Sequence, residues 1–581
     1  MGKVKSSNPV GRLMRGRRWS TASLAGVSFV GGLLEAGFLI IITRAAFAVT
    51  EGVHDVEIVD GHPLGIGVTV ALSLVLVVVR IGVSLLSNLQ SARIVSTVSA
   101  DVRTELADAF FDASWGVQQN DESGRLQEVL TNFADRAGSV VSAITVVIAS
   151  VFSLLAILGL AVAVNPAASV IVLGAVVGLG ALLWPIRRVI ERFSKRTVAA
   201  RIALASSLNE ISQVGMEVHV FNVQPMAKAQ VGHLIADNRN SQARLAFIQG
   251  IVPTLYSGLA YIVLAGAVAV VAASDSSNLT SLGASMLLML RSLFYGQLTQ
   301  TNIASISSSQ PFIHRLFTQI EIYRDGHVAD HGEPIESVAT LRLEHVGFEY
   351  ELGKPVLFDI DLTIDSRQMV CIIGPSGGGK STMVQLMLGL RQPTSGRVLA
   401  DGRDVSRIAR DQWARRVTFV PQTPHLISGT VADNIRFFRP DVSAADIERA
   451  ARLAHLHDDV LGWSGGYEHQ VGPRGSGLSG GQQQRICIAR ALVEAPDVIV
   501  LDEPTSALDG ISESLIRDTL GQLRSTMTVI VIAHRLSTLS LCDRLIILED
   551  GRVKDFDTPA NLEMASEFYR SVLTLSGPRP M

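Results

Sequence analysis

Long apolar stretches fill the first half of the chain, and each of them predicts a membrane helix. A helix that crosses a bilayer needs about 20 mostly apolar residues. Six stretches before Tyr323 meet this need: Ser23–Val49, Leu64–Leu89, Val140–Val164, Ala167–Val189, Leu245–Ala273 and Leu282–Ile306. The last stretch is the weakest, because Ser, Thr and Gln interrupt it. Residues 1–323 are therefore predicted to form an α-helical membrane domain of six helices.

Basic residues gather on one side of these predicted spans. The segment before the first span carries Lys3, Lys5, Arg12, Arg15, Arg17 and Arg18. The segment after that span holds acidic residues but neither Lys nor Arg, whereas the long connections 90–138 and 191–244 are rich in Arg. Because loops with excess Lys and Arg stay in the cytoplasm, the N-terminus is predicted to be cytoplasmic. A signal peptide is not expected, since the first span is too long and lacks a convincing cleavage site.

The two basic connections contain few Pro or Gly residues, so they are predicted to be helices that continue into the cytosol. Each has a break, at Trp115–Gly124 and at Phe221–Pro225. A break of this kind suits a short transverse helix that touches a partner domain. It equally suits an ordinary turn between antiparallel helices.

Three charged residues, Glu35, Arg80 and Arg291, lie deep inside predicted spans. Charges in a membrane are costly and usually face protein or water. One interpretation is that Arg291, with Arg80, faces a cavity and meets an acidic or phosphate-bearing substrate. The preferred interpretation is a buried ion pair between Glu35 and an arginine that fixes helix packing.

The pattern changes after Tyr323. Residues 324–340 are polar and predict a linker, and strand and helix patterns alternate after it. Met369–Ile373 is a short apolar strand that leads into a glycine-rich loop and an amphipathic helix, which is the context of a phosphate-binding P-loop. The loop consists of Gly374, Pro375, Ser376, Gly377, Gly378, Gly379, Lys380, Ser381 and Thr382. Residues 341–576 are therefore predicted to be an α/β P-loop NTPase domain.

The residue types of this loop suit a nucleotide. Its glycines let backbone N–H groups surround phosphates at a helix N-terminus. Lys380 places a cation on the outer phosphates, and the Ser381 hydroxyl can ligate Mg²⁺.

Two further apolar strands end in residues suited to phosphate chemistry. Val498–Leu501 is followed by Asp502 and Glu503. Asp502 can hold a metal through water, and Glu503 can orient or deprotonate the attacking water. Thr528–Ala533 ends in His534, which is a candidate to contact the γ-phosphate and, taken alone, is equally a structural histidine.

A second glycine-rich helix start lies between the strands Met369–Ile373 and Val498–Leu501. Leu478 is followed by Ser479, Gly480, Gly481 and Gln482, which run straight into a helix. Such a start is another anion cradle. We expect each nucleotide to touch the P-loop of one copy and this second cradle of another copy, which predicts a head-to-tail dimer closed by two nucleotides.

Together these motifs resemble ABC transporters. The P-loop is similar to the family's Walker A motif, Leu478–Gln482 to its signature, and Val498–Asp502 to its Walker B motif. The order of the motifs also agrees. A six-span membrane domain fused before a motor domain resembles the exporter-type half transporters, so the resemblance covers nearly the whole chain.

The resemblance implies further roles. Tyr350 is similar to the aromatic residue that stacks on adenine, and Gln422 to the glutamine that senses metal and γ-phosphate. Ser506–Asp509 matches the loop that links two nucleotide sites. Glu503 is implied as the catalytic base and His534 as the switch histidine. The chain breaks near Trp115–Asp121 and Val218–Pro225 then look like coupling helices.

One position departs from the family pattern. Pro473 stands before the signature, where many exporters carry Glu. In the family this loop is thought to touch the coupling helices, so the loss of the carboxylate bears on coupling and not on hydrolysis. Glu503 is retained, which permits a symmetric homodimer and does not exclude a related half transporter as partner.

Composition narrows the remaining alternatives. The net charge of −3 argues against nucleic acid as a partner. The three cysteines show no framework spacing, so we expect buried thiols in a reducing cytosol. The rival functions are a membrane-anchored ATP-dependent regulator or gate, and a DNA-maintenance ATPase, which the membrane spans disfavour.

The sequence therefore predicts an ATPase of the cell membrane with ATP and Mg²⁺ as cofactors. It is expected to move a solute or lipid across the bilayer by alternating access. Export is favoured over import, because the modules are fused and no receptor domain is attached.

Overall fold

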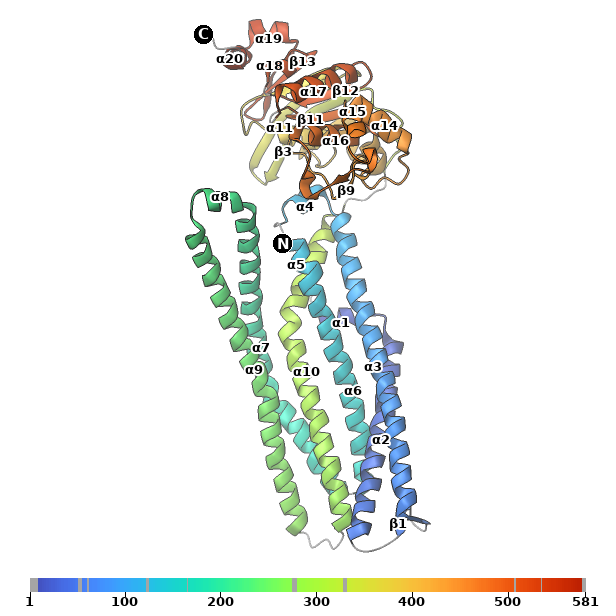
Figure 1. Ribbon diagram of the computed structural model, residues 1–581. Helices are drawn as coiled ribbons and strands as arrows, with labels where there is room; N and C mark the ends of the chain where they lie inside the picture. Colours follow the sequence, from blue (N-terminus) through green and yellow to red (C-terminus); the bar gives the residue numbers. More distant parts are fainter. Residues whose placement is uncertain are drawn as a thin grey trace. The chain divides into compact units, whose positions relative to one another are not determined.

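The computed structural model of this protein describes residues 9–50, 55–59, 62–121, 125–164, 166–273, 279–327, 332–505, 508–533 and 535–576 (Figure 1). The chain divides into two compact units. The first contains residues 1–113 and 117–327, and the second contains residues 114–116 and 328–581. The last helix of the first unit ends at Asp325, and the first strand of the second begins at Leu341.

The first unit is a bundle of long helices (Figure 1). Its helices are α1 (Pro9–Leu13), α2 (Arg18–Thr50), α3 (Ile66–Phe111), α5 (Arg125–Glu128), α6 (Ala134–Val164), α7 (Pro166–Gln213), α9 (Gln224–Ala273) and α10 (Leu279–Asp325), with a π-helical turn at Val129–Phe133. Helix α10 packs along α6 and α7, α2 packs between α3 and α6, and α7 packs along α9. A small antiparallel hairpin, β1 (Asp55–Val59) and β2 (His62–Gly65), joins α2 to α3.

Five of the described helices are long and apolar enough to cross a membrane: Arg18–Thr50, Ile66–Phe111, Arg125–Ala163, Val172–Gln213 and Gln224–Gly266. They cover the first five predicted spans. The sixth predicted span, Leu282–Ile306, lies within α10, which is not among those five. Its polar residues lower its hydropathy, yet α10 packs inside the same bundle.

The helices continue well beyond the predicted spans, as expected. Helix α3 has 46 residues, which is about 70 Å of helix and more than twice the thickness of a bilayer core. A short helix stands at each predicted break, namely α4 (Trp115–Gln119) and α8 (Gly215–Val220). The second lies a few residues earlier than predicted, because Pro225 occupies the first turn of α9 instead of the bend. Residues 122–124 of the first break lie outside the described residues.

Small residues let α2 and α6 approach closely. A Cβ atom added to Gly32 would lie 2.8 Å from the Cα atom of Ser153, so only glycine fits there. The Ser153 hydroxyl donates a hydrogen bond to the backbone oxygen of Ser28 at 3.1 Å. Close backbone contact through small residues is how membrane helices commonly associate.

The second unit contains two sheets. The larger has the order β14-β13-β5-β12-β11-β8. Its strands are β5 (Met369–Ile373), β8 (Val417–Val420), β11 (Val498–Asp502), β12 (Thr528–Ile532), β13 (Arg544–Glu549) and β14 (Arg552–Asp557). All pairs are parallel except β13 with β14. Central strands of a parallel sheet are covered on both faces, which explains their continuous apolar runs.

The smaller sheet is antiparallel, with the order β4-β3-β6-β7. Its strands are β3 (Leu341–Glu351), β4 (Lys354–Ile364), β6 (Ser395–Ala400) and β7 (Arg403–Asp404). A further two-stranded pair joins β9 (Gly429–Thr430) to β10 (Gln470–Val471). The predicted α/β architecture of this half is confirmed.

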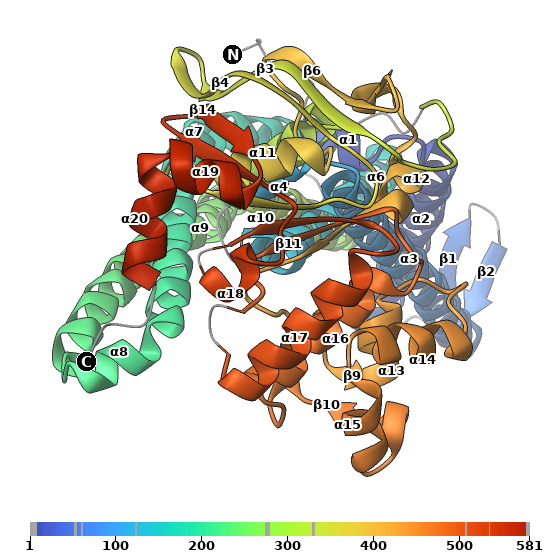
Figure 2. The same cartoon turned by 90° about the horizontal axis from the view of Figure 1, so that it is seen from above.

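Helices α16 (Gly480–Leu492) and α17 (Gly510–Leu523) cover one face of the larger sheet, and the smaller sheet covers the other together with α11 (Lys380–Met387), as Figure 2 shows. One face packs on a core with α16 and α17, and the other on a core with β3 and β4. The helices of the unit are α11 (Lys380–Met387), α12 (Arg410–Arg416), α13 (Val431–Arg436), α14 (Ala444–Leu453), α15 (His457–Gly462), α16 (Gly480–Leu492), α17 (Gly510–Leu523), α18 (Leu536–Leu539), α19 (Pro559–Ala565) and α20 (Glu567–Ser576).

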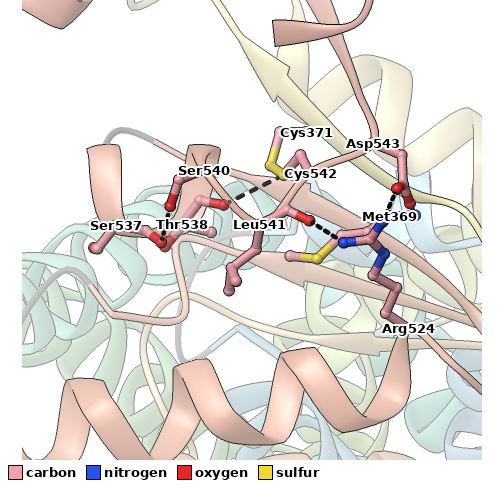
Figure 3. Close-up of a disulfide and its surroundings, with 9 residues drawn as sticks. All are labelled: Met369, Cys371, Arg524, Ser537, Thr538, Ser540, Leu541, Cys542 and Asp543. Atoms are coloured by element: carbon pink, nitrogen blue, oxygen red, sulfur yellow. Dashed lines mark hydrogen bonds and ion pairs between the residues drawn. A yellow bond between two sulfur atoms is a disulfide. The ribbon is translucent and has the colours of Figure 1, made fainter.

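The expectation of three free thiols is wrong for two of the cysteines. The structure joins Cys371 of β5 to Cys542 by a disulfide, with 6.0 Å between their Cα atoms (Figure 3). Strands β5 and β13 are parallel neighbours, and Cys542 precedes β13, so two residues 171 apart in sequence meet. Cys487 is a buried free thiol.

Candidate functional site

The glycine-rich loop connects the end of β5 to the start of α11. Three of its glycines adopt backbone angles that L-residues rarely take, with φ of 156° at Gly374, 81° at Gly377 and 97° at Gly379. A Cβ atom on Gly374 would lie 2.0 Å from the backbone oxygen of Leu548 in β13. The loop thus holds a conformation that depends on glycine and leaves its N–H groups free of side-chain cover.

Lys380 is buried at the start of α11, beneath the loop. Its Nζ atom donates hydrogen bonds to the backbone oxygens of Gly374 at 2.8 Å and Pro375 at 2.9 Å. Burial lowers the pKa of Lys380, and the nearby carboxylates of Glu503 and Asp502 oppose that shift. The lysine therefore stands between the loop and the acidic residues that end β11.

Gln422 and Glu503 meet because their strands are in register. Val420 of β8 pairs with Leu501 of β11, so the residues two positions later emerge at the same edge of the sheet. The Gln422 Nε2 atom donates a hydrogen bond to Glu503 Oε2 at 2.9 Å. Glu503 has a left-handed backbone with φ of 42°. Such strain in a non-glycine residue is typical of functional sites.

Tyr350, at the end of β3, lies beside the phosphate loop. Its hydroxyl is 3.0 Å from the hydroxyl of Thr382. The rings of Tyr350 and Phe348 contact each other edge to face. The guanidinium of Arg391 lies over the Tyr350 ring at 4.7 Å from its centre. Residue Tyr350 is 51% exposed.

Arg391 is a residue that the sequence did not single out. It follows α11 and is 41 positions from Tyr350, and its Nε atom donates to Gln385 Oε1 at 2.7 Å. The only signal for it was a basic residue after a P-loop helix, which is too common to select one arginine.

The second predicted cradle forms the start of α16. Ser479 caps this helix, because its hydroxyl accepts from the N–H of Gln482 at 3.3 Å while the Gln482 side chain accepts from the Ser479 N–H at 3.0 Å. A Cβ atom on Gly481 would lie 2.2 Å from the hydroxyl of Ser512, which requires glycine there. Within the described residues, no hydrogen bond or ion pair joins Ser479–Gln482 to the P-loop.

Three residues of the predicted site fall outside what the structure describes. They are His534 and, in the loop after β11, Ser506 and Ala507. Asp509, the last residue of that loop, precedes the first turn of α17. Pro473 starts a short 3₁₀ turn at Pro473–Gly475, ahead of the signature.

The residues present fit a nucleotide with Mg²⁺. Gly374 and Gly379 give the loop a backbone shape that glycine allows, and Ser381 is exposed at the first turn of α11. Among the described residues, no group of three or more His, Cys, Asp or Glu could hold a metal alone. Mg²⁺ commonly completes its shell with phosphate oxygens and water, which agrees with so few protein ligands.

The three charged residues of the membrane helices form one cluster. Glu35 is 3% exposed, and its carboxylate contacts Arg80 at 2.9 Å and Arg291 at 2.7 Å. The hydroxyl of Tyr295 donates to Glu35 Oε2 at 2.6 Å. The preferred interpretation, an ion pair that fixes packing, thus agrees with these contacts, which join α2, α3 and α10.

Comparison with known proteins extends over both units. Residues 26–298 match the family described as ABC transporter transmembrane region, and residues 357–506 match the family described as ABC transporter. The matched ranges include Gln422, Glu503 and the signature. They leave out Tyr350 and His534.

Individual relatives match different shares of the chain. ABC transporter B family member 29, chloroplastic, of Arabidopsis thaliana is 30% identical over 81% of this chain and 74% of its own length. A mycobactin import ATP-binding/permease protein of Mycolicibacterium thermoresistibile is 40% identical over 40% of this chain, which is 26% of that protein. The fold is similar to that in a structure of a bacterial Atm1-family ABC exporter with ATP bound, with TM-score 0.83 and 21% identity over 98% of this chain and 99% of the other.

Proposed function

This chain belongs to the ABC transporter family, and from that premise we propose that two copies use ATP to export a solute or lipid by alternating access. ATP-driven translocation follows from membership of the family. We propose in addition the direction of transport, the assembly of two copies and the role of each site residue. The contact of Gln422 with Glu503 beside the phosphate loop is the observation that carries it.

The motor unit would bind ATP through the loop and hydrolyse it at the end of β11. Lys380 would leave the carbonyls of its loop for the outer phosphates, and Tyr350 would stack on adenine. Glu503 would take a proton from the attacking water, with Gln422 orienting its carboxylate. His534 would contact the γ-phosphate. Ser381, Gln422 and Asp502 would hold Mg²⁺, partly through water, and the ion neutralises charge on the phosphates when bound.

The dimer is proposed because one copy holds two separate anion cradles. Ser479, Gly480 and Gly481 of a second copy would close over the nucleotide on the P-loop. Asp509 precedes α17, whose Ser512 lies next to Gly481, and this position supports a role for Asp509 in linking the two sites. The partner is a second copy or a related half transporter.

The test of the catalytic role is Glu503→Gln in the full-length protein. The amide keeps the shape of the side chain and the contact with Gln422 but cannot accept the proton. We expect ATP to bind with unchanged affinity and to hold a closed dimer, while hydrolysis falls by about 100-fold or more. Phosphate release and nucleotide binding are the measurements.

The control is Glu468→Gln, which removes an exposed carboxylate of the same unit, in the short turn Gly466–Glu468. It should keep normal turnover. Undiminished hydrolysis in Glu503→Gln would remove the assigned base.

The direction and orientation need a separate measurement. We propose that the chain lies in the cell membrane with its N-terminus and motor unit in the cytoplasm. The fused modules support export. One relative, which aligns with this chain over 233 residues, is named for import. In proteoliposomes with outward-facing motor units, an exporter accumulates its solute inside when ATP is added outside. Solute-independent ATPase activity without accumulation would favour a regulator or gate.

A further inference from the structure

A cavity of about 430 Å³ lies in the first unit between the start of α2 and the middle of α3. Residues 17–23 form one wall, and residues 90–97 form the other. The lining residues are Arg17, Trp19, Ser20, Ser23, Gln90, Arg93, Ile94 and Thr97. Gln90, Arg93 or Ile94, and Thr97 follow one another by one helical turn, so one face of α3 closes the cavity.

The cavity stands where the apolar spans meet water. The first predicted span begins at Ser23 and the second ends at Leu89, so the lining residues lie at the same end of both. Trp19 is 89% exposed. Tryptophan is enriched at the level of lipid headgroups, because its ring is apolar and its N–H is polar.

The charge in this cavity is positive. Arg17 forms an ion pair with Asp101 and donates to the Leu13 backbone oxygen at 3.4 Å. Arg93 is exposed, and within the described part of the chain its guanidinium has no hydrogen bond or ion pair. Arg15 and Arg18 are exposed beside Trp19.

The walls also carry uncharged polar groups. Gln90 Nε2 donates to the Ser23 hydroxyl at 3.2 Å. The other polar atom of that amide, Oε1, is buried without a hydrogen-bond partner in the described residues. An unpaired buried polar atom costs free energy unless something else pairs with it.

The surface on the membrane side of the cavity is apolar. Leu85, Leu86 and Leu89 of α3, within two turns of Gln90, are 59%, 48% and 58% exposed. A ligand that occupied the cavity could therefore continue along these side chains. That surface suits hydrocarbon and not a soluble ion.

We propose that this cavity binds the headgroup of an anionic phospholipid. Its phosphate would lie on the Arg93 guanidinium, and its acyl chains would lie along Leu85, Leu86 and Leu89. A planar guanidinium can donate two parallel hydrogen bonds to one phosphate. The wall at residues 17–23 precedes the matched transmembrane region, which begins at residue 26, whereas the wall at residues 90–97 lies within it.

The test is binding of short-chain lipids to the full-length protein in detergent, measured by native mass spectrometry. Dioctanoyl-phosphatidylglycerol should bind at least about tenfold more tightly than dioctanoyl-phosphatidylcholine. Arg93→Gln should reduce phosphatidylglycerol binding about tenfold, since a hydrogen bond to a charged group is lost. Arg93→Lys keeps the charge without the fork and should lose less.

The matched control is Arg244→Gln. Arg244 is also exposed and stands next to a predicted span that begins at Leu245, but it is not among the residues that line this cavity. It should leave lipid binding unchanged. The melting temperature of each variant shows whether it is folded.

Three results would overturn the proposal. One is equal binding of the two lipids. Another is an equal loss for Arg93→Gln and Arg244→Gln, which would indicate diffuse attraction. The third is displacement of the lipid by millimolar inorganic phosphate, which would make this a site for a soluble anion.

Discussion

At the residue scale, Lys380 shows how burial adjusts a binding group. Burial disfavours its charged form, so its pKa lies below that of an exposed lysine despite the nearby Glu503 and Asp502. ATP binding requires the ammonium, and bound phosphate would raise the pKa again. The affinity for ATP should therefore be full near neutral pH and fall as pH rises through the lowered pKa.

The measurement is the ATP dissociation constant of the full-length protein between about pH 7 and pH 10, a range that ends near the ordinary lysine pKa. Each pH unit above the pKa can cost up to about tenfold in affinity. Lys380→Arg is the control, because guanidinium stays charged throughout. Parallel profiles for the two proteins would show that another group titrates.

At the element scale, the turn from β5 to α11 depends on glycine for two different reasons. Gly377 has φ of 81°, and a Cβ atom there would meet nothing within 4 Å. Gly374 combines an unusual φ with a Cβ position only 2.0 Å from the Leu548 backbone oxygen. Ala at position 377 adds backbone strain alone. Ala at position 374 adds backbone strain and must also push β13 away.

We expect Gly377→Ala to cost about 1–2 kcal/mol of stability through its backbone. Gly374→Ala should cost about 1–3 kcal/mol more from overpacking and should weaken ATP binding further. Urea unfolding and ATP titration of both variants check this. Similar losses for the two would mean that the contact with β13 relaxes easily.

At the scale of the whole molecule, the proposed composite sites can be tested by mixing defective chains. Lys380→Ala removes the P-loop cation, and Ser479→Phe blocks the second cradle. Each homodimer should be inactive. A mixed dimer retains one intact site, made of the P-loop of the Ser479→Phe chain and the signature of the Lys380→Ala chain.

Mixed dimers, co-expressed and purified through two different tags, should therefore recover hydrolysis at roughly half of the wild-type level or below. The level is limited because only one of the two sites is intact. Wild-type pairs that carry the same tags give the reference. If either variant keeps full turnover as a homodimer, or if the mixture stays inactive, the head-to-tail arrangement is contradicted.

Local patterns carried most of what the sequence could tell. Membrane helices need a contiguous run of apolar residues, so all six spans could be predicted, and the sixth was the weakest because polar residues of α10, such as Arg291 and Tyr295, pair with Glu35 of α2. The short helix α8 was misplaced by a few residues, since a turn and a helix start share the same signals around Phe221–Pro225. The cysteine expectation failed for Cys371 and Cys542 because sequence spacing gave no sign that they would meet.

By itself, the sequence determined the family, the order of the two halves and the identity of the phosphate loop, because each depends on residues that are consecutive in the chain. Tertiary structure alone decided which distant residues meet: Gln422 with Glu503, Glu35 with both Arg80 and Arg291, and Trp19 with Arg93 around one cavity. Those contacts depend on strand register and on the rotation of packed helices. No local pattern encodes either, since both are set by how whole elements bury their apolar faces.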